Sequence, residues 1–200
     1  MDDARLFYPA TGRNREPILD VLREVVPSGG CVLELASGSG EHAVYFAARL
    51  EGVRWIASDT EPKARASIVA WAQHEGLDNI EVCDVDAEMH PWSVQAPVDV
   101  VLCVNMIHIA PWSACQGLMA GAGEVLSPGG ALVTYGPYMR GGRHTAASNA
   151  SFDASLRGRN PAWGVRDVDE VQAEAEECGM LLERIVEMPA NNLSLIFRRQ

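Results

Sequence analysis

The chain has 200 residues, the length of one ordinary domain, and its hydrophobic (48%) and charged (22%) fractions are those of a packed globular protein and not of a disordered one. Sixteen Lys and Arg residues against 27 Asp and Glu residues give a net charge of -11. Because no basic face is left to neutralise a phosphate backbone, we expect no nucleic-acid partner.

The sequence carries no evident signal for membrane insertion or export. No stretch approaches the roughly 18 to 20 apolar residues of a membrane span, and the start Met1-Asp2-Asp3 has acids where a signal peptide has positive charge. The five cysteines are odd in number and far apart, which is typical of free thiols. The sequence therefore predicts a cytoplasmic protein without a membrane partner.

Helices and strands are predicted to alternate over the first two thirds of the chain. The first helix begins at Asn14 as N-cap, has Pro17 in its first turn and ends near Val26. The next elements are a strand over 31–35, a helix over 43–50, a strand over 53–57, a helix over 62–74, strands over 80–83 and 98–104, a helix over 111–126 and a strand over 131–135. This alternation predicts a parallel sheet with helices packed on it.

The last third of the chain begins with a stretch rich in Gly, Arg and Ser over 136–150. A short helix near Phe152 and a longer one over 167–178 follow. Strands over 181–188 and 193–198 close the chain, and the turn Pro189-Ala190-Asn191-Asn192 between them predicts a hairpin with an antiparallel final strand. Since no repeat or linker divides the sequence, we expect residues 1–200 to form one domain.

A glycine loop, Glu34-Leu35-Ala36-Ser37-Gly38-Ser39-Gly40, joins the first strand to the second helix. Small residues at such a junction let the backbone approach a cofactor closely. The glycine spacing alone also fits the dinucleotide fingerprint, in which a pyrophosphate rests on the helix N-terminus. The carboxylate of Glu34 would repel a pyrophosphate but can accept hydrogen bonds from an ammonium group, which favours S-adenosylmethionine over NAD. An ion pair with an arginine is the structural alternative for Glu34.

Two more acids follow predicted strands. Asp59 comes nineteen residues after Gly40, the distance at which an acid accepts hydrogen bonds from ribose hydroxyls in either cofactor. Asp84 follows the strand over 80–83, where its carboxylate can accept a hydrogen bond from the adenine amine. A turn or helix cap is the alternative role for Asp84.

The loop from Glu34 to Gly40, Asp59, Asp84 and the turn over 126–130 (Leu-Ser-Pro-Gly-Gly) together resemble the class I S-adenosylmethionine-dependent methyltransferases, over about residues 32–133. One departure is Ala36, which stands where the family's loop has its first glycine. The resemblance implies a Rossmann-like three-layer α/β sandwich whose seven-stranded, mostly parallel sheet has the order 3-2-1-4-5-7-6 with strand seven antiparallel. It also implies S-adenosylmethionine as cofactor, S-adenosylhomocysteine as product, and cofactor contacts from Glu34, Ala36, Gly38, Gly40, Asp59, Asp84, Val85 and Asn105.

A narrower resemblance rests on four sequence blocks that span nearly the whole chain. The blocks are Asn14-Arg15-Glu16-Pro17-Ile18, Asn105-Met106-Ile107-His108-Ile109-Ala110-Pro111-Trp112, Gly142-Arg143-His144-Thr145 and Pro189-Ala190-Asn191-Asn192. They resemble a methyltransferase-like family that is named only as a domain of unknown function.

The methyl acceptor is expected beyond the carboxyl ends of the strands, beside residues 105–108. His108 is the candidate catalytic base, because a histidine near neutrality can take the proton of a hydroxyl or thiol. A buried core imidazole is the alternative for His108, and Asn105 takes part in catalysis or only orients the backbone.

A local excess of positive charge over 138–166 suits an anionic acceptor. Ordinary helix ion pairs, such as Asp153 with Arg157, are the alternative explanation. The candidate acceptor-binding residues are Tyr8, Asn14, Trp112, Tyr138, Arg140, Arg143 and His144. Residues 1–30 and 136–161 are expected to supply lids over the site.

The leading hypothesis is a methyltransferase that acts on the oxygen, nitrogen or sulfur of a small molecule. Two alternatives stay open: an NAD(P)-dependent oxidoreductase, and a module that binds S-adenosylmethionine without turnover. The histidines are not spaced as metal ligands and no Cys-x-x-Cys motif occurs, so we expect no metal site. The sequence leaves open whether the protein is a monomer or a homodimer.

Overall fold

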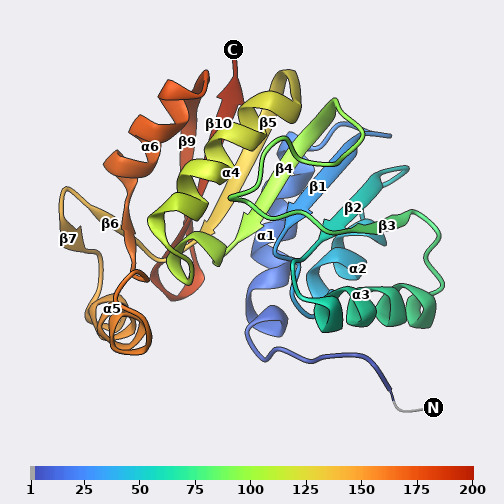
Figure 1. Ribbon diagram of the computed structural model, residues 1–200, viewed down its shortest axis with the longest axis horizontal. Coiled ribbons are helices and arrows are strands. Elements are labelled where there is room, and N and C mark those ends of the chain that lie inside the picture. The colour runs from blue at the N-terminus through green and yellow to red at the C-terminus, as the bar shows by residue number, and fades with distance from the viewer. Residues whose placement is uncertain (1–2) are drawn as a thin grey trace.

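A seven-stranded sheet forms the centre of the computed structural model, which describes residues 3–200 and leaves Met1 and Asp2 of the acidic start outside the described part (Figure 1). Its strands are β1 (Cys31–Leu35), β2 (Arg54–Ser58), β3 (Ile80–Cys83), β4 (Val98–Val104), β5 (Leu126–Gly136), β9 (Met180–Met188) and β10 (Asn192–Arg199). They lie in the order β3-β2-β1-β4-β5-β10-β9, and β10 pairs antiparallel with both β5 and β9. Counted along the chain, β9 and β10 are strands six and seven of this sheet, so the expected order 3-2-1-4-5-7-6 is confirmed.

Helices cover both faces of the sheet, which gives the expected three-layer α/β sandwich (Figure 1). One layer holds α1 (Thr11–Val25), α2 (Glu41–Ala47) and α3 (Pro62–Glu75), and the other holds α4 (Trp112–Val125) and α6 (Val168–Glu177). Alternate residues of β1 serve the two layers: Val32 joins the apolar cluster of α1 and α2, and Leu33 joins that of α4. All five residues of β1 are buried because neither face of the strand meets water.

The first helix begins at Thr11, three residues before the expected N-cap at Asn14. Asn14 is instead a buried residue inside α1, and its Oδ1 lies 2.9 Å from Nε2 of His42. Pro17 also lies inside the helix, where its missing N–H leaves one carbonyl of the preceding turn without its helical partner. The prediction of the helix start was wrong because this tertiary contact and the burial of Thr11 outweigh the local capping signal.

The segment after β5 is more regular than the sequence suggested. Three short strands, β6 (Tyr138–Arg140), β7 (Arg143–His144) and β8 (Arg166–Asp167), form a second sheet in the order β7-β6-β8. The helix expected near Phe152 is α5 (Ala147–Arg159), which is 13 residues long. Strands of two or three residues carry no detectable periodicity, so sequence analysis missed this sheet. The lid role of residues 136–161 stays a prediction.

Of the predicted N-terminal lid, residues 1–30, only the described residues before α1 remain candidates for a lid. Ile18, Leu19 and Leu22 of α1 are fully buried, so this helix belongs to the core and cannot open as a lid. Residues 3–10 run along the surface beside α3 (Figure 1). There the backbone N–H of Leu6 donates to Ser67 Oγ at 2.8 Å, and Trp71 Nε1 donates to the Leu6 carbonyl at 3.0 Å.

Three further properties concern the described residues as a whole. No helix in residues 3–200 is long and apolar enough to cross a membrane. All five cysteines are free thiols; Cys31, Cys103 and Cys115 are buried, and Cys83 and Cys178 are half-buried. No group of three or more His, Cys, Asp or Glu side chains within the same residues is arranged to hold a metal ion.

Candidate functional site

Glu34 is a buried acid near the carboxyl end of β1. Its Oε2 accepts hydrogen bonds from Trp55 Nε1 at 3.1 Å and from Ser37 Oγ at 3.0 Å. Burial, with a smaller contribution from the carboxylate of Asp59, raises the pKa of Glu34 to about 7. Among residues 3–200 no arginine or lysine forms an ion pair with Glu34, so the structural alternative for this acid does not apply.

Asp59 follows β2 and lies at the same edge of the sheet, because β1 and β2 are neighbouring parallel strands. Its Oδ2 accepts a hydrogen bond from the backbone N–H of Gly38, and its Oδ1 accepts one from that of Glu61, both at 2.9 Å. The carboxylate therefore ties the glycine loop to the start of α3. The Asp59 side chain is half-buried and lines two neighbouring cavities described below, which is the placement expected of a ribose-binding acid.

Gly40 has a packing role that the sequence did not reveal. Its φ is +86°, and a Cβ atom at this position would lie 2.7 Å from the Cα of Ile68 in α3. Only glycine permits both this backbone conformation and this approach of α2 to α3. Gly40 does not line the cavities described below, so it shapes the glycine loop and is not placed as a direct cofactor contact.

The glycine loop, Asp59 and the end of β4 enclose a cavity of about 440 Å³, which we call the acidic cavity. The predicted residues that line it are Tyr8, Asn14, Glu34, Ala36, Gly38, Asp59 and Asn105. Its charged side chains are those of Glu34, Asp59 and Glu61, and no arginine or lysine lines it among the described residues. His42, a lining residue that sequence analysis missed, is neutral because burial lowers its pKa to about 4.

An adjoining groove of about 220 Å³ extends from Asp59 and Ala36 toward the loop after β3. Val85 and Asp86 line this groove, as predicted for Val85 but not for Asp86. Asp84 lines neither space; its side chain is 63% exposed and pairs with Arg65 at 3.3 Å. Asp84 therefore faces solvent although Asp86, two residues later, lines the groove, so the turn of the chain after β3 and not strand alternation sets these orientations. Its contact with the cofactor stays a prediction that this placement does not favour.

A second cavity, of about 610 Å³, shares Ala10, Asn14, Asn105 and Ile109 with the acidic cavity. The remaining lining comes from α1, β5, α5 and the loop between β9 and β10. Its charged side chains are those of Arg13 and Arg159, so we call it the arginine cavity. Sequence analysis included Arg159 only within the positive excess over 138–166 that suits an anionic acceptor, and it did not propose Arg13. Asn105, in the left-handed conformation with φ +64°, stands where the two cavities meet.

His108 is fully buried and lines neither cavity. Its Nδ1 accepts a hydrogen bond from the backbone N–H of Arg166 at 3.3 Å, and its ring packs edge-on against Tyr138. Burial and the charge of Arg166 lower the pKa of His108 to about 3. The geometry therefore favours the buried core imidazole over the catalytic base.

Five of the candidate acceptor-binding residues lie away from both cavities. Tyr138 is buried and donates to Thr134 Oγ1 at 2.7 Å, and Arg140 pairs with Glu187 at 2.8 Å. Trp112 lies 5.4 Å from the guanidinium of Arg166, and Arg143 is exposed. These predictions rested on the local positive charge and on the aromatic side chains. Four of the five residues belong to the short second sheet, and Trp112 begins α4, so their side chains lie elsewhere.

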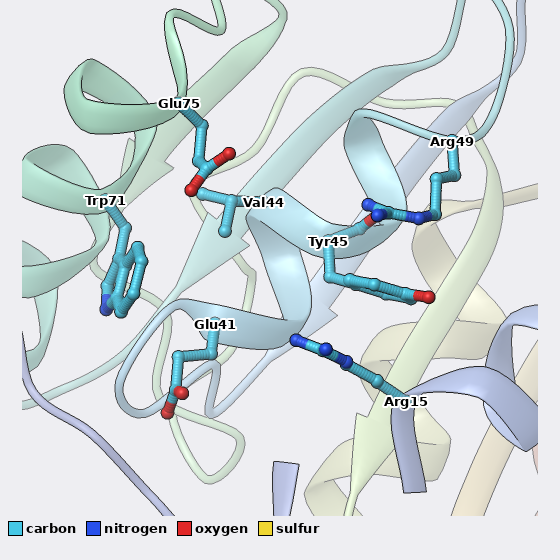
Figure 2. A pocket seen from close by; sticks show the side chains of 7 residues that line it. All are labelled: Arg15, Glu41, Val44, Tyr45, Arg49, Trp71 and Glu75. Atoms are coloured by element: carbon cyan, nitrogen blue, oxygen red, sulfur yellow. The ribbon is translucent and has the colours of Figure 1, made fainter. Parts of the chain in front are cut away.

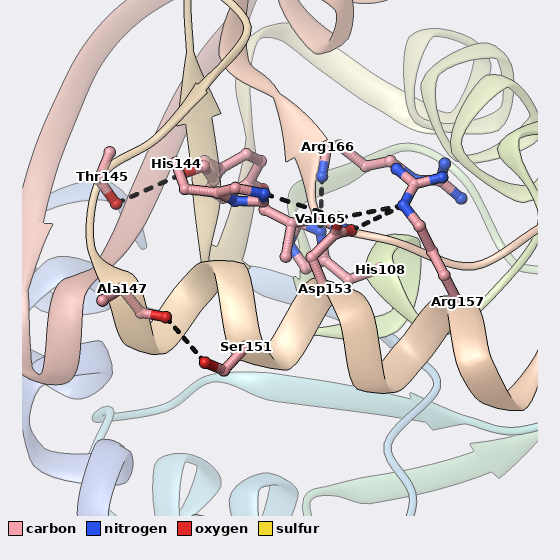
Figure 3. Close-up of polar contacts among 10 residues, drawn as sticks. His108, His144, Thr145, Ala147, Ser151, Asp153, Arg157, Val165 and Arg166 are labelled. Atoms are coloured by element: carbon pink, nitrogen blue, oxygen red, sulfur yellow. Dashed lines mark hydrogen bonds and ion pairs between the residues drawn. The ribbon is translucent and has the colours of Figure 1, made fainter.

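His144, the fifth of these residues, belongs to a structural cluster under α5. Figure 3 shows Asp153 of α5 facing His144, Arg157 and the backbone N–H of Val165. His144 Nε2 lies 3.6 Å from the Asp153 carboxylate, which also accepts from Arg157 Nε at 3.0 Å and from the Val165 N–H at 2.7 Å. This cluster fixes α5 to β7 and to the segment before β8.

A third cavity, of about 160 Å³, lies between α1, α2 and α3 and is shown in Figure 2. The guanidinium carbons of Arg15 and Arg49 lie 4.4 and 3.7 Å from the centre of the Tyr45 ring. Glu41 and Glu75 line the same cavity, so its wall carries two acids beside the two arginines. Its arginines are thus already engaged, and it shares no lining residue with the two larger cavities.

This sheet order and glycine loop define the class I S-adenosylmethionine-dependent methyltransferase fold. An O-methyltransferase family protein from Burkholderia thailandensis matches with a TM-score of 0.80 at 19% identity, over 96% of this chain and 57% of that one. An O-methyltransferase family 2 protein from Planctomyces limnophilus DSM 3776, in complex with apigenin, matches with 0.83 at 20% identity, over 95% and 59%. A protein described as a sarcosine dimethylglycine methyltransferase from Galdieria sulphuraria matches with 0.73 at 16% identity, over 100% and 94%. The chain thus spans little more than half the length of the first two.

Within this fold class the chain belongs to one family. Residues 5–199 match the model of the family described as protein of unknown function DUF938. The match covers nearly the whole chain, and the expected membership in a family named only as a domain of unknown function is confirmed.

Proposed function

We propose that the protein is an S-adenosylmethionine-dependent methyltransferase that acts on a small molecule. The observation that carries this proposal is the pair of adjoining cavities with opposite charge at the carboxyl edge of the sheet. The acidic cavity suits a cofactor that carries a sulfonium and an ammonium group, and the second cavity leaves room for an acceptor. The named activities of the proteins with the same fold support this choice.

The acidic cavity and its groove fit the proposed cofactor in size and chemistry. The acidic cavity, at about 440 Å³, lies within the range of small-molecule sites, and the groove of about 220 Å³ extends it. Glu34 would accept hydrogen bonds from the ammonium group, Asp59 from the ribose hydroxyls, and Asp86 from the adenine amine. When bound, S-adenosylmethionine supplies a methyl group that is electrophilic because its sulfur is a sulfonium.

The arginine cavity is assigned to the acceptor, and its residues bind and orient rather than move protons. Its lining within residues 3–200 includes no Asp, Glu, His, Lys or Cys. Burial raises the pKa of the Tyr135 hydroxyl, which therefore stays protonated at neutral pH. The acceptor atom must attack without a strong base from the cavity wall, and Asn105 at the junction would orient it. Whether the atom is oxygen, nitrogen or sulfur is left to the acceptor assay.

The carboxylates around the glycine loop disfavour the alternative of an NAD(P)-dependent oxidoreductase. A dinucleotide pyrophosphate at this loop would face Glu34 and Asp59 in the cavity. It would also meet Glu41 in the first turn of α2, whose carboxylate already accepts hydrogen bonds from Ser39 Oγ and the Tyr8 N–H. Anion binding at a helix N-terminus needs free N–H groups and no competing carboxylate.

Isothermal titration of the protein with S-adenosylmethionine, S-adenosylhomocysteine and NAD tests the cofactor. We expect micromolar binding of both S-adenosyl compounds and none of NAD. A coupled assay of S-adenosylhomocysteine release over a panel of small nucleophiles then tests turnover. Binding of NAD alone would overturn the proposal, and cofactor binding without turnover on any acceptor would favour the non-catalytic module.

A further inference from the structure

The arginine cavity is positively charged in a protein of net charge -11, and this imbalance points to its ligand. Arg13 lies in the first turn of α1, and Arg159 is the last residue of α5. No carboxylate lines the cavity among residues 3–200, so nothing in its wall neutralises the two guanidinium groups. An anionic ligand would complete the charge balance.

The side chains of Arg13 and Arg159 stand apart from most arginines of the chain. Eight other arginines form ion pairs with Asp or Glu, namely Arg5, Arg23, Arg54, Arg65, Arg140, Arg157, Arg184 and Arg198. Arg13 and Arg159 form none in the described structure. The Arg159 guanidinium carbon lies 5.0 Å from the centre of the Trp163 ring, an arrangement that leaves the N–H groups at the edge of the guanidinium able to donate.

The cavity of Figure 2 shows that arginines in a cavity wall of this protein can be accompanied by acids. There Arg15 and Arg49 flank the Tyr45 ring, and Glu41 and Glu75 line the same cavity, so carboxylates in its wall offset the arginine charge. The chain therefore has acids available to pair with arginines at cavity walls. In the arginine cavity such acids are absent from the described lining, and Arg13 and Arg159 line the space as exposed residues.

The rest of the cavity wall is mainly apolar. Tyr135, Pro137, Ile109 and Pro189 line it, and Phe152 projects from α5 with 41% of its surface exposed. An exposed phenylalanine in a concave site is typical of a wall that is covered by ligand. The body of the acceptor should therefore be apolar and about the size of a ring or a short chain.

We propose that the methyl acceptor is a small carboxylate with an apolar body, and that Arg13 and Arg159 bind its carboxylate. This inference rests on the proposed function, because it names the substrate class of the same site. A guanidinium donates two parallel hydrogen bonds to a carboxylate, which is its best-matched small partner. Because the two arginines come from α1 and α5, binding would also connect the two elements that flank the cavity mouth.

Titration with matched ligands tests the proposal. The probes are phenylacetate and 3-phenylpropanoate with their primary amides, each titrated into protein saturated with S-adenosylhomocysteine and into protein alone. We expect each carboxylate to bind about tenfold more tightly than its amide, and this preference to weaken as salt is raised. Arg13→Gln and Arg159→Gln should each lower carboxylate affinity about tenfold while leaving amide affinity unchanged.

Arg143→Gln is the matched control, because Arg143 is exposed on β7, forms no ion pair in the described structure and lines neither cavity. We expect less than a twofold change for this variant, and thermal melts should show that all three variants stay folded. Equal binding of carboxylates and amides, no binding of the carboxylates, or an equal loss in Arg143→Gln would overturn the proposal. Failure of the proposed function would give a different result, because the wild-type protein would then not bind S-adenosylhomocysteine.

Discussion

The acidic cavity and the arginine cavity share one edge of the sheet but are built in different ways. Half of the residues that line the acidic cavity fall within 34–61, over β1, the glycine loop, the first turn of α2 and the residues after β2. The arginine cavity draws on separate stretches at 10–14, 105–109, 135–137, 148–159 and 189–192. A site with half of its lining in one stretch of chain can be recognised as a motif, whereas a site assembled from five separate stretches exists only after folding.

Their charges differ as clearly as their construction. The acidic cavity presents carboxylates and no arginine or lysine in the described chain, and the arginine cavity presents two arginines and no carboxylate. Neighbouring sites of opposite charge each discourage the wrong ligand, because a misplaced charge meets a like charge in a partly desolvated space. The predictions below probe the two regions in order of decreasing effect.

Gly40→Ala should give the largest effect, a loss of about 3 kcal/mol of folding stability. The side chain would sit at φ +86° and collide with the Cα of Ile68, so strain and overpacking add. Gly76→Ala is the control, with φ +66° and no atom within 4 Å of the added Cβ, and should cost about 1 kcal/mol. Urea unfolding measures both variants. Equal losses would mean that the contact of α2 with α3 does not explain Gly40.

His108→Ala should lower stability by about 2 kcal/mol, because it leaves a cavity and an unpartnered Arg166 N–H. The pKa of His108 is lowered to about 3 in the native protein. In the unfolded chain the same imidazole binds a proton below about pH 6.5, whereas in the native protein it stays neutral until about pH 3. The wild type should therefore lose stability as the pH falls from 6.5 toward 3, and the variant should lack this share of the loss.

Turnover separates the two roles of His108. If the residue is structural, folded His108→Ala keeps its rate within about twofold and its pH profile between 5 and 8 unchanged. A fall of about a hundredfold, with loss of an inflection in the profile, would restore His108 as the base.

Glu34→Gln should lower affinity for S-adenosylhomocysteine about tenfold at pH 7.5, because the amide cannot offer a negative charge to the ammonium group. The same variant should be more stable than the wild type at that pH. Burial raises the pKa of Glu34 to about 7, so the unfolded chain loses its proton from about pH 4.5 upward while the native protein keeps it until about 7. Wild-type stability thus falls between these values, and the variant should show no such slope in denaturant titrations. Lower stability together with unchanged affinity would contradict the assignment.

Asp59→Asn compared with Asp84→Asn gives the smallest expected difference. Asp59 supports the loop through the Gly38 N–H and faces the cavity, so its variant should bind S-adenosylhomocysteine about fivefold more weakly. The Asp84 side chain is mostly exposed and forms an ion pair with Arg65, so Asp84→Asn should change the affinity for S-adenosylhomocysteine less than twofold. Calorimetric titration compares the two, and a larger loss at Asp84 would reinstate its predicted cofactor contact.

Sequence reasoning succeeded where function and local structure coincide. Glu34 and Asp59 were predicted from the strand ends, Gly38 from the glycine loop and Ala36 from the family resemblance, and the structure brings all four into one cavity. It failed where a short segment turns its side chains: Asp84 and Asp86 differ by two positions, yet only Asp86 lines the groove. Nothing in the local sequence signals the orientation of a residue just beyond a strand end, because the neighbouring loop decides it.

By itself, the sequence determined the α/β class, the strand order expected from the resemblance, and the glycine loop with its two acids. These features depend on hydrophobic periodicity and on residues near one another in the chain. Only the tertiary structure decided that His108 is buried and that Arg13 and Arg159 face one cavity. The physical reason is that burial and the meeting of distant segments depend on packing α1 and α5 against the sheet edge, and no local pattern encodes that packing.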